Sequence, residues 1–355
     1  MMKFSNPEVL DKLMEGGFIP AHPLALNSDL TIDEQSHRRL TRYYLACGVD
    51  GIAIGVHTTQ FEIRDPQFNY YRQVLKITAD ELSRSGKAGS LIKVAGICGP
   101  VNQALEEAEI AQSLGYDLGL LSMGGLSDLS EDQLLDRTRQ VAKVIPVFGF
   151  YLQPSVGGRV FSYDFWKKFC DIPNVCAIKT APFDRYQTLD VVRAICHSGR
   201  EPEIALYTGN DDNIVNDLIT SYRFKVGDRV VEKRFVGGLL GHYAVWTKKS
   251  VELFRHLKEG LRKGTLDYPA VLQTGVEVTD MNSAIFDVAH RFKGSISGIH
   301  EVLIRQGLIK GIWCLSPEEK LSEGQKEEID RVISQYPHLV DDIFVKEFLL
   351  NDSKG

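Results

Sequence analysis

Short apolar runs alternate with longer segments of helical periodicity from residue 17 to about residue 262. This alternation is typical of βα units that build a parallel sheet. Eight runs are predicted as strands: Phe18–Ala25, Gly51–Gly55, Ile92–Ile97, Leu118–Met123, Val144–Leu152, Val175–Ala181, Glu203–Thr208 and Phe235–Leu240. Eight strand–helix repeats in about 250 residues predict an α/β fold of the (β/α)8 TIM barrel class.

Helices are expected between the strands, among them Ile32–Cys47 and Gln103–Leu114. The first carries an Asp33-Glu34 pair, whose negative charges suit a helix N-terminus. An open, doubly wound sheet is the alternative architecture, but it favours fewer strands and a glycine-rich phosphate-binding turn after the first strand. No such turn follows Phe18–Ala25.

The domain organisation is expected to be a barrel over residues 1–265 and a helical appendage over residues 266–355. Charged and apolar residues alternate around Gly227-Asp228, which predicts a β-hairpin over Tyr222–Phe235. This hairpin would be inserted at the bottom of the barrel, just before the eighth strand. Four helices are predicted in the appendage: Asn282–Phe292, Ile296–Gln306, Pro317–Gln335 and Asp341–Leu349.

Composition narrows the classes of function. The 355 residues are 43% hydrophobic and 25% charged, as in ordinary globular proteins. A formal net charge of -6 argues against a nucleic-acid partner, since phosphate binding requires clustered Lys and Arg. The N-terminal residues lack the pattern of a signal peptide, and no window reaches the roughly 18 apolar residues of a membrane span. A cytoplasmic protein with a small-molecule partner is therefore expected.

The cysteines stand singly in apolar stretches, without a CxxC pair. They are Cys47, Cys98, Cys170, Cys176, Cys196 and Cys314. This distribution indicates neither a metal cluster nor a disulfide framework. Buried free thiols are expected.

A lone lysine, Lys179, stands in the apolar strand Val175–Ala181. Strand alternation places it on the face of Ala177 and Ala181, whose small side chains leave room for its stem inside the barrel. Desolvation favours the neutral amine, which is the form that attacks a carbonyl. A lysine at a strand end can also extend its amine to water. Its place at the C-terminal end, where barrel active sites lie, favours a catalytic role.

Tyr151 ends the preceding strand and shares a face with Val147 and Gly149. We expect it to point inward beside Lys179, because strands five and six are neighbours in a barrel. A phenol in that place can transfer protons to and from a carbinolamine. The alternative is a packed aromatic ring whose hydroxyl is already satisfied.

The loop after the second strand reads Gly55-Val56-His57-Thr58-Thr59-Gln60-Phe61-Glu62. Its paired hydroxyls and its backbone N–H groups could hold a carboxylate, because successive amides in a tight turn form an anion-binding nest. A Thr-Thr pair is also ordinary turn chemistry.

Taken together, these segments resemble the dihydrodipicolinate synthase and N-acetylneuraminate lyase superfamily of class I aldolases. The resemblance runs from Gly17 to about Gln335. The segments that carry it are Gly17–Ala21, Leu30–Asp33, Gly48–Ile52, the motif Tyr151-Leu152-Gln153-Pro154, the strand Val175-Cys176-Ala177-Ile178-Lys179, Tyr207–Asp212 and Ser316–Glu319.

This resemblance implies a lyase, aldolase or hydro-lyase that holds pyruvate or another small 2-keto acid as an imine on Lys179. Tyr151 and a threonine, taken as Thr58, would relay protons. Substrate contacts are expected from His57, Thr59, Gln60, Gln153, Thr208, Gly209 and His242. No metal and no organic cofactor are expected, because the protonated imine serves as the electron sink. Family members are commonly tetramers, so a homo-oligomer, dimer or tetramer, is expected, with an aldehyde as a possible second reactant.

The chain departs from the lysine-pathway synthase at three places. Val156 stands where an arginine would hold the second substrate's carboxylate, and Met123–Leu126 stands where a tyrosine pair is expected. The substrate loop has His57-Thr58-Thr59-Gln60 in place of Thr-Thr-Gly-Glu, which leaves open which threonine relays protons. We therefore expect a divergent member whose second reactant is less anionic near Val156.

The sequence is consistent with two other functions, a metal-dependent enzyme and a binding protein without turnover. His22, His57 and His242 follow strands one, two and eight, and three neutral imidazoles can bind zinc with a position left open for substrate. This would make a metal-dependent aldolase or hydrolase. The third possibility is a barrel that binds a keto acid on Lys179 without turnover. Retention of both Lys179 and Tyr151 argues against it, since burying a lysine is costly unless its charge is removed or paired.

Overall fold

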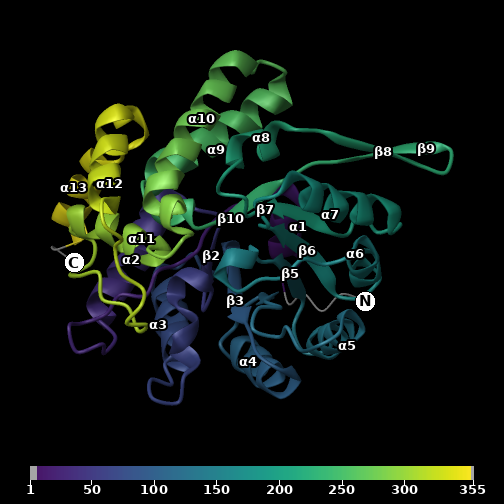
Figure 1. The fold of residues 1–355 in the computed structure, drawn as a ribbon, viewed down its shortest axis with the longest axis horizontal. Helices are drawn as coiled ribbons and strands as arrows, with labels where there is room; N and C mark the ends of the chain where they lie inside the picture. Colours follow the sequence, from purple (N-terminus) through teal and green to yellow (C-terminus); the bar gives the residue numbers. More distant parts are fainter. Residues whose placement is uncertain (1–5, 353–355) are drawn as a thin grey trace. The chain divides into compact units, whose positions relative to one another are not determined.

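The computed structural model describes residues 6–352. Eight strands form one sheet in the order β1-β10-β7-β6-β5-β4-β3-β2 (Figure 1). This topology confirms the predicted (β/α)8 barrel. The strands are β1 Phe18–Pro20, β2 Gly51–Ile54, β3 Ile92–Ile97, β4 Leu118–Leu121, β5 Val147–Tyr151, β6 Val175–Thr180, β7 Ala205–Thr208 and β10 Gly237–Leu240.

All eight predicted strands are present, and most are shorter than their apolar runs. The run predicted from Phe18 to Ala25 pairs as a strand only to Pro20, and the run from Val144 begins to pair at Val147. The flanking apolar residues remain buried after the chain has left the ladder. Hydrophobicity reports burial, whereas a strand is defined by its hydrogen bonds.

Helices follow most strands at the predicted places. They are α2 Glu34–Cys47, α3 Tyr71–Arg84, α4 Val101–Ser113, α5 Glu131–Val141, α6 Tyr163–Cys170, α7 Arg185–His197, α8 Ile214–Ile219 and α9 Thr247–Lys263. Helix α1, Pro7–Glu15, precedes the barrel and was not predicted. It begins with Pro7 after Asn6, whose side chain accepts a hydrogen bond from the N–H of Glu8, a common N-cap arrangement.

The chain divides into two compact units. The first unit is the chain up to Gly17 together with Gly89–Leu239, and the second is Phe18–Ala88 together with Leu240 to the end. Strands β3 to β7 and most of β10 belong to the first unit. There Lys179 of β6 lies opposite Phe150 of β5, and the register of the β5–β6 pair shifts between Val147 and Phe148.

Tyr207 of β7 closes the core of the first unit at its N-terminal helix. Its hydroxyl donates a hydrogen bond to the carbonyl of Leu13 at 2.9 Å and accepts one from the N–H of Gly17 at 2.9 Å. Its ring lies 5.2 Å from that of Phe148. A Cβ at Gly237 would lie 2.4 Å from the Gly17 carbonyl oxygen, so the close approach of the chains requires a glycine there.

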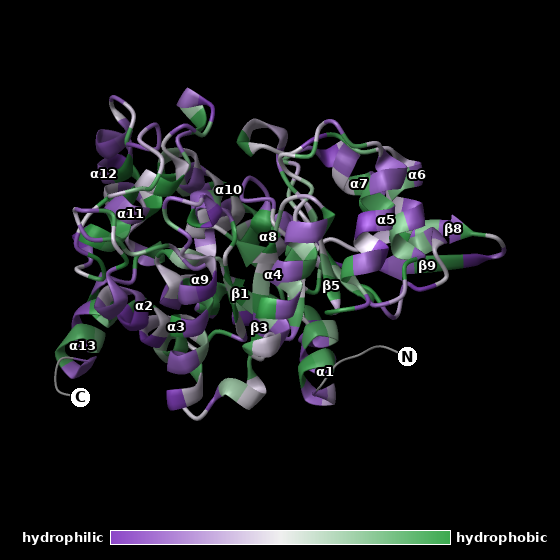
Figure 2. Ribbon diagram, turned by 90° about the horizontal axis from the view of Figure 1, so that it is seen from below, coloured by the Kyte–Doolittle hydropathy of each residue, from purple (hydrophilic) through white to green (hydrophobic). Residues whose placement is uncertain are grey.

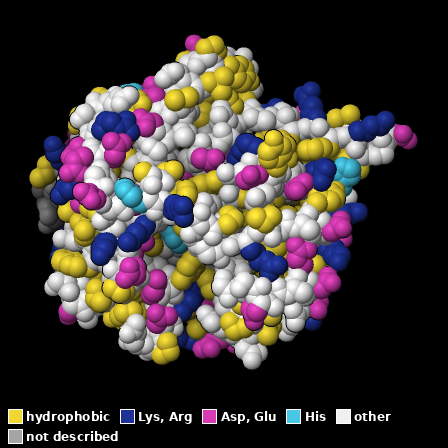
Figure 3. All heavy atoms as spheres, in the orientation of Figure 1, with side chains coloured by type: hydrophobic (Ala, Val, Ile, Leu, Met, Phe, Trp, Pro, Cys, Tyr) yellow, Lys and Arg dark blue, Asp and Glu magenta, His cyan; other side chains and the backbone are white. Residues whose placement is uncertain are grey.

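The predicted hairpin is confirmed as β8, Tyr222–Val226, and β9, Arg229–Lys233, which pair antiparallel. Gly227 takes the left-handed conformation that the turn needs, with φ at 60°. The hairpin leads into the N-terminal end of β10, as expected. It projects as a ribbon in Figure 1, and Figure 3 shows Lys and Arg side chains along it.

In the second unit β1 and β2 are joined by a parallel bridge between Ala21 and Ala53. The C-terminal helices are α10 Tyr268–Ile285, α11 Ser295–Arg305, α12 Gln325–Gln335 and α13 Asp342–Asp352. Helices α11 and α13 confirm the predicted ones. The other two predictions were displaced: α10 begins far ahead of Asn282, and α12 begins at Gln325 instead of Pro317.

Local contacts explain both displacements. Asp267 caps α10, since its side chain accepts a hydrogen bond from the N–H of Ala270. Glu319, expected inside a helix, instead accepts hydrogen bonds from the N–H groups of Ile296 and Ser297 and so caps α11. A carboxylate at a helix N-terminus satisfies free donors and opposes the helix dipole.

Both faces of the barrel strands are buried, which matters for the site. Every residue of β5 and of β6 is buried. In Figure 2, β5 is coloured as hydrophobic, whereas helices such as α3 and α5 also carry hydrophilic residues. Alternation of hydropathy therefore cannot reveal which face of such a strand points inward.

The state of the cysteines, the absence of a membrane-spanning helix within residues 6–352 and the exposed apolar surface complete the comparison with the predictions. All six cysteines are free, and Cys98 is half-buried while the others are buried. No helix within residues 6–352 is long and apolar enough to cross a membrane. Tyr268, Leu272 and Val276 expose an apolar stripe on α10, each at 47% or more. The predicted homo-oligomer stays a prediction.

Replacing Tyr207 with Phe tests how firmly α1 is held. The substitution leaves the Gly17 N–H and the Leu13 carbonyl without their buried partner, and we expect a loss of about 1–3 kcal/mol in the free energy of unfolding. Urea unfolding followed by circular dichroism measures it. Tyr186→Phe is the matched control, because Tyr186 is 82% exposed. Equal stability of the two variants would contradict this role of Tyr207.

Candidate active site

Lys179 lies buried near the end of β6, with 8% of its surface exposed. Its Nζ is 4.5 Å from the centre of the Phe150 ring. Within residues 6–352 no hydrogen bond or ion pair engages this amine. Burial lowers the pKa of Lys179 to about 8, although the negative charge of Asp211 opposes the shift. The neutral, nucleophilic form is therefore much more populated near neutral pH than in an exposed lysine, although it remains the minority.

Gly209, directly after β7, makes room for the lysine stem. A Cβ at this position would lie 2.5 Å from Lys179 Cε and 2.7 Å from Ala181 Cβ. The N–H of Gly209 donates to the carbonyl of Thr180 at 2.8 Å, which ties the ends of β6 and β7 together. The predicted substrate contact of Gly209 stays a prediction, but its place beside Lys179 is clear.

Asp217 of α8 holds the loops that follow β6 and β7. It is fully buried, and its Oδ2 accepts hydrogen bonds from Thr208 Oγ1 at 2.7 Å and from Asn210 Nδ2 at 2.9 Å. Its Oδ1 pairs with Arg185 at 2.6 Å. Asn210 Oδ1 in turn accepts from the N–H of Phe183. The network fixes the backbone around Lys179, and the sequence offered no local signal for it.

The predicted substrate contact of Thr208 stays a prediction, and its hydroxyl already has partners within the protein. Its hydroxyl donates to Asp217 and accepts from the N–H of Asn210 at 3.2 Å, so it is committed to this network. Thr208 pairs with Thr180 of β6, which in turn pairs with Tyr151 of β5. These three residues form one row on the face of the sheet opposite to that of Lys179.

Tyr151 was predicted to point inward beside Lys179, and this placement is wrong. Its hydroxyl donates to Gln187 Oε1 of α7 at 2.8 Å and accepts from the N–H of Phe161. Its ring lies 5.0 Å from that of Trp166 of α6. Burial raises the pKa of Tyr151 to about 12. Transfer of protons at Lys179 by this phenol therefore has no support in the geometry.

Phe150 takes the position expected for Tyr151. It lies opposite Lys179 in the register, and the register shift at Val147 and Phe148 determines which β5 side chains share the lysine's face. Gly149 is on the other face, since a Cβ there would lie 2.6 Å from the Phe169 ring of α6. Because both faces are buried, the sequence pattern could not distinguish them.

Gln153, two residues after β5, keeps an unmet hydrogen-bonding capacity. It is half-buried, and its Oε1 is a buried acceptor with no hydrogen-bond partner among the described residues. Buried polar atoms are rarely left unpaired in proteins without a ligand or water nearby. The predicted substrate contact of Gln153 stays a prediction that this atom supports.

The substrate loop belongs to the second unit, and its two threonines differ. Thr59 Oγ1 donates to the carbonyl of His22 at 2.8 Å and accepts from the N–H groups of Gly55 and Val56 at 3.0 and 3.2 Å. The Thr59 hydroxyl is therefore committed to the turn, and the predicted substrate contact of Thr59 stays a prediction. Thr58 Oγ1 is buried and has no partner within residues 6–352. Of the two, Thr58 is the hydroxyl left for chemistry.

Gln60 joins this loop to the segment that connects α11 and α12. Its Oε1 accepts a hydrogen bond from the N–H of Leu315 at 2.6 Å, across 255 residues of sequence. Its backbone is left-handed, with φ at 70°, while its buried Nε2 has no partner in the described part of the chain. Gln60 is thus at least a positioning residue. His57 is half-buried, with its ring 5.7 Å from that of Phe61.

His22, His57 and His242 do not form the zinc site that their places after strands one, two and eight suggested. Both ring nitrogens of His22 are engaged, one with the Pro23 carbonyl and one with Thr41 Oγ1. His242 Nε2 pairs with Ser250 Oγ. Burial lowers the pKa of His22 and of His242 to about 4. Within residues 6–352 no three His, Cys, Asp or Glu side chains are grouped to hold a metal.

Comparison with known proteins identifies the family. The model of the dihydrodipicolinate synthetase family matches residues 14–336. N-acetylneuraminate lyase 2 of Escherichia coli O6:H1 is 22% identical over 321 residues, which are 89% of this chain and 92% of that protein. N-acetylneuraminate lyase of Citrobacter koseri is 26% identical over 206 residues, 57% of this chain and 65% of that protein.

Solved structures share the fold. YagE, a prophage protein of the dihydrodipicolinic acid synthase family from E. coli K12, superposes with a TM-score of 0.72 at 18% identity, covering 91% of this chain and 98% of that one. CdNal from Clostridium difficile gives a TM-score of 0.70 at 17% identity, covering 90% and 99%. With the family match over most of its length, the chain belongs to the dihydrodipicolinate synthetase family and is a lyase of the class I aldolase type.

Proposed function

We propose that Lys179 forms an imine with the ketone of pyruvate or another small 2-keto acid. The observation that carries the proposal is the buried amine, whose pKa is lowered to about 8 and which no carboxylate engages directly. The neutral amine adds to the ketone carbon, and the resulting carbinolamine loses water to give the imine. Once protonated, the imine withdraws electrons from the neighbouring carbon as a carbon–carbon or carbon–oxygen bond breaks or forms.

Proton transfer in this scheme needs a hydroxyl that the fold has not already used. Thr58 supplies such a hydroxyl, whereas Thr59 and Thr208 use theirs within the protein. General acid–base catalysis requires a group that is free to exchange its hydrogen bond with the substrate. We assign the relay to Thr58 on this ground.

The first reactant is best sought among 2-keto acids, and the second among neutral aldehydes. YagE was solved in complex with pyruvate, as was N-acetylneuraminate lyase from Fusobacterium nucleatum, which supports pyruvate as the first compound to test. Val156 is half-buried where an arginine would pair with a second carboxylate. A neutral side chain there favours a reactant without a charge at that end.

Trapping with borohydride tests the imine. We expect incubation with pyruvate and reduction to add one covalent adduct, found by peptide mass spectrometry on Lys179 and lost in Lys179→Ala. Lys233 is the matched control, because burial lowers its pKa to about 8 as well while its amine donates to the Glu201 carbonyl. An adduct on Lys233 alone, or none with a panel of 2-keto acids, would overturn the proposal.

The rate of imine formation should rise with pH through about 8, the pKa of Lys179, because the neutral amine is the nucleophile. Asp211 raises this pKa, so Asp211→Asn should move the midpoint to lower pH. Trapping rates measured on both sides of the midpoint give its position. Asp190→Asn, on the half-exposed face of α7, should leave it unchanged. A midpoint that stays or rises in Asp211→Asn contradicts the assignment.

Thr58→Val should lower kcat by about 10²-fold while the urea midpoint stays close to that of the parent, since the hydroxyl has no partner to lose. Tyr151→Phe is the comparison, and its kcat should change less than about tenfold, because its hydroxyl bonds only to Gln187 and Phe161. Steady-state kinetics with the substrate found by screening measures both. The reverse order of the two effects would return the relay to Tyr151.

A further inference from the structure

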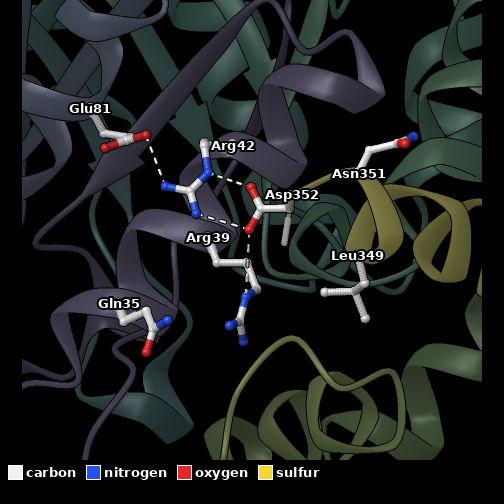
Figure 4. Close-up of a pocket in the computed structure, with 7 residues that line it drawn as sticks. All are labelled: Gln35, Arg39, Arg42, Glu81, Leu349, Asn351 and Asp352. Carbon is white, nitrogen blue, oxygen red and sulfur yellow. Dashed lines mark hydrogen bonds and ion pairs between the residues drawn. The ribbon is translucent and has the colours of Figure 1, made fainter. Parts of the chain in front are cut away.

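A cavity of about 760 Å³ lies in the second unit, among helices α2, α3 and α13. Figure 4 shows the seven residues that line it: Gln35, Arg39, Arg42, Glu81, Leu349, Asn351 and Asp352. Its volume falls within the range of about 300–1,000 Å³ that is typical of small-molecule sites. These residues are not among those proposed to bind or convert the keto acid, so the cavity is a candidate for a separate ligand site.

The two arginines of the cavity are in different states. Arg42 is saturated: its Nε and Nη2 reach the two carboxylate oxygens of Asp352 at 2.5 and 2.9 Å, and its Nη1 reaches Glu81 Oε1 at 3.0 Å. The Nε of Arg39 is 3.7 Å from Asp352 Oδ2, too far for a hydrogen bond. In Figure 4 the Arg39 guanidinium is directed into the space between Gln35 and Leu349.

Arg39 is placed as an oxyanion receptor. Its side chain is only 22% exposed, and its one ion pair within residues 6–352, with Asp352 at 3.7 Å, is longer than a hydrogen bond. A guanidinium offers a planar fork of N–H donors that matches a carboxylate or a phosphate. The negative charge of Asp352 opposes an incoming anion, but the bidentate contact with Arg42 offsets much of that charge.

We propose that this cavity binds a small organic oxyanion, a carboxylate or a phosphate, with its charged group on Arg39. Gln35 lines the cavity beside Arg39 and offers an amide to the polar remainder of the ligand, and Leu349 supplies an apolar wall. The ligand site is independent of the imine chemistry at Lys179, and its test needs no substrate.

Isothermal titration of the whole protein with inorganic phosphate and with citrate, at an ionic strength held constant with sodium chloride, tests the site. We expect saturable binding of at least one probe, with the tighter probe indicating the class of oxyanion. Arg39→Ala should weaken it by about tenfold or more, the usual effect of losing a charged hydrogen-bonding partner. Arg72→Ala, an exposed arginine of α3 outside the lining, should leave the affinity unchanged.

Asp352→Asn should act in the opposite direction. Removing the neighbouring negative charge is expected to tighten binding by roughly threefold, since like charges a few ångströms apart repel even in water. Circular dichroism checks that α13 remains folded in this variant. No saturable binding of either probe, equal binding by Arg39→Ala, or weaker binding by a folded Asp352→Asn would overturn the proposal.

Discussion

The proposed imine chemistry depends on the burial of one amine. An ammonium group taken out of water costs several kcal/mol unless it is paired, and Lys179 has no direct partner among the described residues. Burial disfavours the charged form, so the pKa of Lys179 falls to about 8 and the proton is lost more easily than from an exposed lysine. Two neighbours keep the amine buried. Phe150 places its aromatic ring beside the Lys179 Nζ, and Gly209 has no side chain to occupy the space of the lysine stem.

Polar groups near Lys179 in the first unit, and in the loop after β2 in the second unit, are largely committed to the fold. Asp217 uses Thr208, Asn210 and Arg185 to hold the loops after β6 and β7. Thr59 holds the substrate loop in its turn. A rigid support of this kind is what keeps reacting groups within the small tolerances that catalysis requires. Thr58 Oγ1 and Gln153 Oε1 are two of the buried atoms that stay unpaired among the described residues, and both belong to residues of the predicted site.

The same reasoning separates two kinds of charged cluster. In the Asp217 network each donor has an acceptor within hydrogen-bonding distance, which is the signature of a structural element. In the cavity of the second unit Arg42 is satisfied in that way, whereas Arg39 beside it is not. Arg39 and Arg42 lie about one helical turn apart on α2. The guanidinium of Arg42 is hydrogen-bonded to two carboxylates, whereas that of Arg39 makes only a long ion pair. This difference is the reason for proposing an oxyanion site in the cavity.

The sequence by itself determined the eight strands and the hairpin, because periodicity and turn residues are local signals, and its motifs were enough to recognise the family by resemblance. It also marked Lys179 as a lone charge in a buried strand. Tertiary structure alone decided that Phe150 and not Tyr151 faces the lysine, because both faces of β5 are buried and a register shift resets their order. Tertiary structure also decided that the Thr59 hydroxyl is hydrogen-bonded within the protein, because its partner, His22, is distant in the sequence. For the same reason it decided that Glu319 caps α11. Hydropathy predicts that a residue is buried, but only packing and strand register determine which residues it contacts.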